Sequence, residues 1–220
     1  MFPSECFRNR RSFLKLGAAL ATGVSGLTIF SEPAFSEPAV PQQSDAWVIG
    51  PRAGFSPEIG TLVSMMAFTR MQVLHNVQGM SQQDLDFLID GKANTIGALL
   101  LHLAATDAYF HLNSFQGIAW GKFPDAAKQK WDVPMSLGEP ARKAIKGNSL
   151  EYYVNALNET REKTLAELKK RDDKWLAAVD TEAGMNNYGK WFHVAEHESN
   201  HDGQIKFLKS RVPGAKPAAE

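Results

Sequence analysis

Helical patterns occupy four long stretches of this 220-residue chain, and they constrain its fold more than any other feature. The stretches cover residues 56–79, 94–115, 149–168 and 190–211, and the first three carry apolar residues at steps of three and four. We find no β-type alternation of useful length and no internal repeat. The sequence therefore predicts an all-α fold, a four-helix bundle.

Capping and breaking residues set the expected limits of these helices. Ser56 precedes a first-turn proline and an acid, Ser149 stands at the start of the third helix, and Pro213 ends the fourth. Short helical segments are expected near residues 81–89 and 175–179, with a turn at 184–189. The connection between the second and third helices, residues 117–148, is long enough to carry short structure or to cross the end of the bundle.

The first 36 residues have the character of a cleavable export signal. A basic segment precedes an apolar stretch, residues 16–30, which is too short to span a hydrocarbon core of ~30 Å comfortably. Arg10 and Arg11, followed by a variable residue and then Phe, Leu and Lys, resemble the twin-arginine signal. This resemblance implies export of the folded protein by the twin-arginine machinery, to the periplasm or beyond the cell.

Cleavage after Ser36 would divide the chain into four parts. We expect a signal peptide at 1–36, an extended leader at 37–55, the bundle at 56–214 and a disordered tail at 215–220. The mature chain would contain no membrane span, and the single cysteine, Cys6, would leave with the signal.

Charge and cysteine content exclude some classes of function. The 24 basic and 24 acidic residues balance, which argues against a general nucleic-acid binder. One cysteine excludes a disulfide framework and a thiolate-cluster metal site. Six histidines leave imidazole as the available metal-binding or acid–base group.

Three of these histidines follow one another at helical spacing near the C-terminus. His193, His197 and His201 stand at i, i+4 and i+8, so neighbouring members share one helix face. The outer two are about 12 Å apart along the axis, so two of the three can bind one ion and a third ligand must come from elsewhere.

The best outside candidate is His102, which lies within the strongly apolar helix at 94–115. An unpaired imidazole would be costly there, and a metal site between facing helices removes that cost. A core histidine hydrogen-bonded to a neighbour is the alternative. His75 and His111, near the ends of the first two helices, are weaker candidates for the third ligand.

A second interpretation comes from the segment 197–201, which fits the zincin pattern H-E-x-x-H. In that interpretation Glu198 is the general base. No downstream third ligand and no edge strand for a peptide substrate support it, so it ranks second.

The chain also resembles the DinB/YfiT-like proteins. Three segments carry the resemblance in order and spacing: residues 77–85, 94–104 with His102, and 193–205 with His193, His197 and His201. The similarity extends over roughly residues 59–213.

This resemblance implies a bundle that binds one divalent metal, zinc or nickel, through His102, His197 and His201. Three ligands leave an open position, as in catalytic sites. His193 and Asp107 would then contact the ligands rather than the metal.

The resemblance suggests a metal-dependent hydrolase or thiol S-transferase acting on a small molecule, because characterised relatives include thiol-dependent transferases. Trp120 and Trp131 in the connection are candidates for the pocket mouth. The alternatives are a non-catalytic metal- or ligand-binding bundle and a structural module that forms a homodimer.

Overall fold

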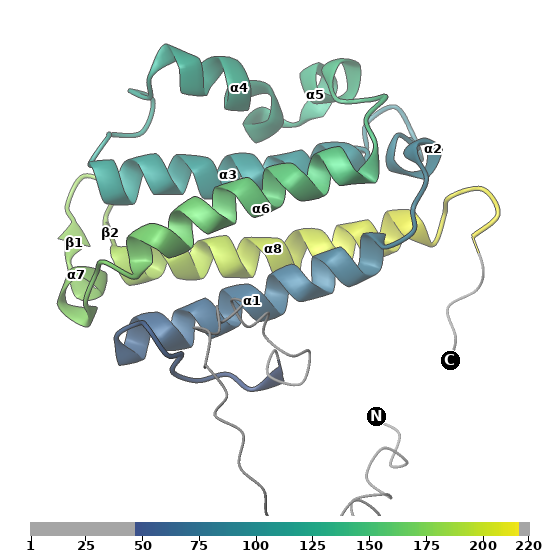
Figure 1. Ribbon diagram of the computed structural model, residues 1–220. Helices are drawn as coiled ribbons and strands as arrows, with labels where there is room; N and C mark the ends of the chain where they lie inside the picture. Colours follow the sequence, from purple (N-terminus) through teal and green to yellow (C-terminus); the bar gives the residue numbers. More distant parts are fainter. Residues whose placement is uncertain (1–46, 216–220) are drawn as a thin grey trace, which may run out of the picture. The chain divides into compact units, whose positions relative to one another are not determined.

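The computed structural model describes residues 47–215, and four long helices dominate this part of the chain (Figure 1). They are α1 (Pro57–Val77), α3 (Ile96–Gln116), α6 (Leu150–Leu168) and α8 (Asn187–Lys209). The predicted all-α four-helix bundle is confirmed. The expected signal peptide, most of the leader and the last five residues lie outside the described residues.

Shorter elements connect the long helices. They are α2 (Gln82–Leu85), α4 (Asp125–Ser136), α5 (Gly138–Ala144), α7 (Asp173–Ala177) and the antiparallel strands β1 (Val179–Asp180) and β2 (Met185–Asn186). The long connection between α3 and α6 thus carries two helices of its own. None of the helices within residues 47–215 is long and apolar enough to cross a membrane.

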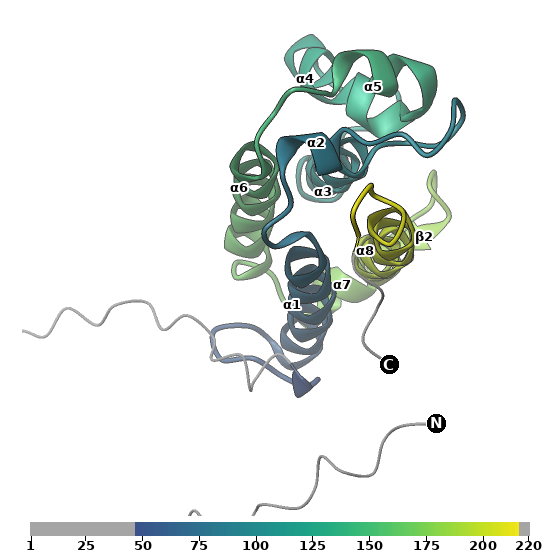
Figure 2. The same ribbon diagram turned by 90° about the vertical axis from the view of Figure 1, so that its right-hand side faces the viewer.

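The end view shows how the long helices surround the core (Figure 2). α1 packs against α8, α8 against α3, α3 against α6, and α6 against α1, so each long helix contacts two others in this ring. α4 lies on the outer side of α3. Because α3 is covered on that side as well, Leu99, Leu100, Leu101 and Leu103 are all buried.

The cap of α1 and the start of α8 differ from the sequence prediction. Ser56 stands at the N-cap position of α1, but its side chain makes no capping bond and instead donates to Asp173 Oδ1 at 2.5 Å. The backbone N–H groups of Glu58 and Ile59 also donate to that carboxylate, at 3.2 Å each. A residue of α7 therefore caps α1.

The other difference concerns α8, which begins at Asn187 rather than near residue 190. The side chain of Asn186 accepts a hydrogen bond from the Gly189 N–H at 2.7 Å, so the cap falls inside the segment expected to be a turn. Both strands of the hairpin before it have only two residues, too few for a period-two pattern.

Candidate metal centre

Three histidines from two neighbouring helices converge in the bundle. His102 lies on α3, and His197 and His201 lie on α8. The Nε2 atom of His197 is 2.8 Å from Nε2 of His102 and 3.1 Å from Nε2 of His201. One ring nitrogen from each residue lies within 4.8 Å of the other two. We call these three residues the histidine cluster.

The outward-facing nitrogens of two members have fixed partners. His102 Nδ1 lies 3.0 Å from the carbonyl oxygen of Pro134 in α4, and His201 Nδ1 lies 3.2 Å from Oε1 of Gln204. A carbonyl oxygen only accepts, so each Nδ1 carries the hydrogen. Each Nε2 therefore presents a lone pair to the centre of the cluster, the tautomer that metal-binding histidines use.

The surroundings keep the cluster uncharged at neutral pH. Burial lowers the pKa of His102 to about 4 and that of His197 to about 3, and the neighbouring His201 adds to both shifts. Burial also lowers the pKa of His201. Three neutral imidazole nitrogens this close together repel one another unless a cation or proton lies between them. The donor set fits a divalent ion such as zinc or nickel.

His193 lies one turn before His197, next to the cluster. Its ring centroid is 5.2 Å from that of His197 and 5.6 Å from that of Phe110, and its Nδ1 is 3.2 Å from Glu196 Oε2. The ring is partly exposed. His193 therefore lies alongside a cluster member, where sequence reasoning expected it to act as a neighbour of the ligands.

The two carboxylates expected near the site lie in a different cluster. Asp107 accepts from Arg161 Nε at 2.8 Å and from the Thr164 hydroxyl at 2.5 Å. Glu198 accepts from Arg70 Nη2 at 2.5 Å and from Arg161 Nη2 at 2.7 Å. All four charged side chains are buried.

This ion network (Arg70, Asp107, Arg161 and Glu198) takes one residue from each long helix and balances two positive with two negative charges. The second oxygen of Glu198 accepts from the Thr69 hydroxyl at 3.0 Å. Since one of its oxygens accepts from the two arginines and the other from Thr69, we do not retain Glu198 as a general base. Sequence reasoning missed the two arginines, although each interrupts an apolar helical stripe.

A row of aromatic rings lies beside His193, the neighbour of the cluster. Trp120 is 41% exposed, and its ring centroid lies 5.0 Å from that of Phe110, which in turn contacts His193. A path of rings thus leads from the surface to the histidine cluster. Trp131, the other tryptophan considered for the pocket mouth, is buried and lines a different hollow with Leu101 and residues of α6.

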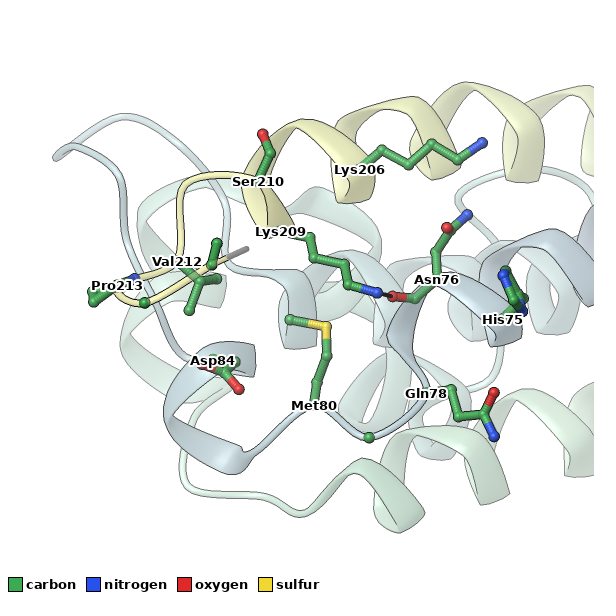
Figure 3. Close-up of a pocket in the computed structure, with 13 residues that line it drawn as sticks. His75, Asn76, Gln78, Met80, Asp84, Lys206, Lys209, Ser210, Val212 and Pro213 are labelled. Carbon is green, nitrogen blue, oxygen red and sulfur yellow. Dashed lines mark hydrogen bonds between the residues drawn. The ribbon is translucent and has the colours of Figure 1, made fainter. Parts of the chain in front are cut away.

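The remaining histidines lie elsewhere. His111 packs edge-to-face on Phe115, with ring centroids 5.0 Å apart. His75 lines a cavity of about 970 Å³ at the C-terminal ends of α1 and α8 (Figure 3). Lys209 spans part of this cavity and donates to the carbonyl oxygen of Asn76 at 2.6 Å. No member of the histidine cluster is among the described residues that line it.

The chain matches a known protein family. Residues 61–214 match the model of a protein family described as Mycothiol-S-transferase, a range that contains the whole histidine cluster and the ion network. No curated protein matches the chain.

Proposed function

The chain belongs to the mycothiol-S-transferase family, and from this premise we propose that it is a metal-dependent S-transferase that joins a low-molecular-weight thiol to a small electrophile. The observation that carries the proposal is the convergence of three imidazole rings on one point, with His102 and His201 buried and His197 partly buried. Of the two reactions expected from the sequence, hydrolysis and S-transfer, the family favours the second.

His102, His197 and His201 would hold the ion, zinc or nickel. When bound, such an ion acts as a Lewis acid that lowers the pKa of a coordinated thiol. Pro134 orients the ring of His102 and Gln204 orients that of His201, and each contact keeps the Nε2 atom of its ring unprotonated.

We place the electrophile on the aromatic side of the cluster. Trp120, which is 41% exposed, contacts Phe110, and Phe110 contacts His193, so a row of rings leads from the surface to the histidines. In the overall reaction a carbon–sulfur bond forms, the bond between carbon and the leaving group breaks, and the thiol proton passes to solvent.

Chelation followed by reloading tests this function. We expect protein reloaded with zinc or nickel to conjugate a thiol to 1-chloro-2,4-dinitrobenzene, measured by absorbance, and the chelated protein to be inactive. His197→Ala should lose the ion and lower kcat/KM at least about a hundredfold, because it removes a direct ligand.

The matched control is His75→Ala, which alters an exposed histidine outside the cluster. It should keep about one ion per chain and wild-type activity. Turnover that survives complete metal removal, or equal losses in the two variants, would contradict the proposal.

We also propose that the protein is exported through the twin-arginine route. The support is the order of residues 10–15 and the apolar stretch that follows. That route exports folded proteins, so the ion would be acquired before export.

A further inference from the structure

The short helices α4 and α5 are separated by a single residue, Leu137 (Figure 1). The backbone of Leu137 has φ 52° and ψ −150°, and among residues 47–215 it is the one residue other than glycine with a positive φ. A residue with a β-carbon rarely adopts this conformation, because it costs free energy. Contacts from other parts of the bundle must therefore hold the break between the two helices.

One such contact comes from the loop before α3. The Oδ1 atom of Asn94 accepts a hydrogen bond from the Gly138 N–H at 3.0 Å. In a continuous α-helix the same N–H would donate to the carbonyl oxygen four residues earlier, which is that of Pro134. Asn94 thus takes the donor that an unbroken helix would give to the Pro134 carbonyl.

The Pro134 carbonyl has another use, because it accepts from Nδ1 of the buried His102 at 3.0 Å. If α4 and α5 merged into one helix, the Gly138 N–H would compete with the imidazole for this oxygen and draw the carbonyl toward the helix axis. His102 would then lose the partner that fixes its hydrogen on Nδ1. The break at Leu137 and the orientation of His102 therefore depend on each other.

A second contact holds α4 on the other side of Pro134. The hydroxyl of Tyr109, a buried residue of α3, donates to Asp132 Oδ1. Asp132 stands two residues before Pro134, and Gly138 stands four residues after it. The segment is thus attached on both sides of the carbonyl, and the attachment through Gly138 is the one that engages a helical donor.

We propose that Asn94 is a positioning residue for the candidate metal centre: by binding the Gly138 N–H it leaves the Pro134 carbonyl to His102 and so keeps the Nε2 lone pair of that ring available to the ion. The assignment rests on the metal centre of the proposed function and does not depend on the reaction. Asn94 itself contacts neither the ion nor its ligands in this assignment.

Substitutions at Asn94 separate its acceptor atom from its bulk. Asn94→Leu has a similar size and no acceptor, so Leu137 can relax to a helical conformation and the Gly138 N–H can return to Pro134. Asn94→Asp keeps the accepting oxygen and should behave as the wild type. Asn94→Ala removes the acceptor without adding apolar bulk and should repeat the result of Asn94→Leu.

Arg142→Met is the matched control. Arg142 lies on α5 and donates to the carbonyl oxygen of Lys92, in the loop that contains Asn94, at 3.1 Å. The substitution therefore removes a contact between the same loop and the same region of the bundle, but one that does not involve the Gly138 N–H.

The first experiment measures the tautomer of His102 in the metal-free full chain. Nitrogen-15 NMR of the imidazole nitrogens, assigned with His102→Gln, distinguishes a hydrogen on Nδ1 from one on Nε2. The hydrogen should be on Nδ1 in the wild type, in Asn94→Asp and in Arg142→Met. In Asn94→Leu and Asn94→Ala the form with the hydrogen on Nε2 should become the major one.

The second experiment measures zinc affinity by competition with a chromophoric chelator. Asn94→Leu should raise the Kd for zinc about tenfold, as expected when a metal-binding histidine loses the partner that orients it. Asn94→Asp and Arg142→Met should stay within about twofold of the wild type. A side chain that only stabilised the fold would change the unfolding temperature and leave the tautomer as it is.

The outcomes separate this proposal from the proposed function. If the wild type binds no zinc but Asn94→Leu changes the tautomer, the metal centre is wrong and the control of His102 by Asn94 stands. If zinc binds and Asn94→Leu has the wild-type tautomer, the positioning role is overturned, whatever its Kd, and the metal centre stands. Failure of Asn94→Asp to restore the tautomer, or an equal change in Arg142→Met, would also overturn the positioning role.

Discussion

Glu198 and His197 are neighbours in sequence but serve different parts of the bundle. Successive residues of a helix are rotated by about 100°, so the imidazole meets α3 while the carboxylate meets α1 and α6. One helix of this chain thus contributes both to the candidate metal centre and to the ion network that joins the four long helices.

Replacement of Glu198 by glutamine tests the structural role of its charge. Glu198→Gln leaves the network with two arginines and one carboxylate in a buried position, so the free energy of unfolding should fall by about 3 kcal/mol. Urea unfolding measures the change. Metal content should remain at about one ion per chain.

Glu196→Gln, an exposed carboxylate on the same helix, is the control and should change stability by less than about 0.5 kcal/mol. If Glu198→Gln behaves like this control in urea but loses the ion, the carboxylate supports the metal centre and not the fold.

At the scale of single residues, the sequence predicts which residues are important better than it predicts the direction of their side chains. The spacing places His193, His197 and His201 on one face, where two of them can bind one ion, and the apolar surroundings make His102 a candidate for the third ligand. The choice of His197 and His201 as the pair comes from the family resemblance. The direction of Asp107 and Glu198 depends on which helices pack beside them, and residue spacing within one helix does not contain that information.

At the scale of elements, α7 fixes the start of α1. Asp173 accepts from the Ser56 hydroxyl and from two backbone N–H groups in the first turn of α1. A carboxylate in this position accepts hydrogen bonds from N–H groups that have no partner within the helix. Its negative charge also interacts favourably with the positive end of the helix dipole. A segment of five residues therefore has a structural role that its length does not suggest.

The stability that Asp173 provides should depend on pH. The hydrogen bond from Ser56, followed by the backbone N–H groups, lowers the pKa of Asp173 below its ordinary value of 3.8. The folded state thus favours the carboxylate, so the stabilisation is present above pH 3.8 and is lost as the pH falls through the lowered pKa.

Thermal unfolding of Asp173→Ala should accordingly show a lower Tm than wild type at pH 7 and a smaller difference below pH 3.8. Glu162→Ala, an exposed position on α6, should show no such pH-dependent difference. A Tm difference for Asp173→Ala that is the same at both pH values would mean that the charge is irrelevant.

Long helices are the part of the fold that the sequence predicts well. Their periodicity extends over five or more turns, and serine, threonine, glycine and proline mark their ends. The cap of α1 by Asp173 could not be predicted, because the donor and acceptor groups are 114 or more residues apart in the chain.

At the scale of the whole molecule, a bound ion would connect α3 and α8. Since the unfolded chain does not hold the three imidazoles together, metal binding should stabilise the folded state. A free zinc concentration a hundredfold above Kd should add about 2.7 kcal/mol to the free energy of unfolding.

Thermal unfolding with zinc and with a chelator measures this effect. The Tm of the wild-type protein should rise with zinc concentration, whereas that of His197→Ala should not. A rise of equal size in both would place the ion outside the histidine cluster.

Export is a property of the whole chain that cell fractionation can test. The double variant Arg10→Lys/Arg11→Lys should remain in the cytoplasm in a host with a twin-arginine system, while the wild type leaves it. Lysine keeps the positive charge, so the comparison isolates the arginine pair. Continued export of the variant would refute the twin-arginine assignment.

The contact between His102 and the Pro134 carbonyl limits the ways in which substitutions can change the candidate metal centre during evolution. The acceptor that orients this ring is main chain, so no side-chain replacement in α4 can delete it. What a change in α4 can do is shift the whole helix and so rotate the imidazole by a small angle. The connection between α3 and α6 is therefore a place where natural variation can adjust the chemistry of the centre while all three histidines stay the same.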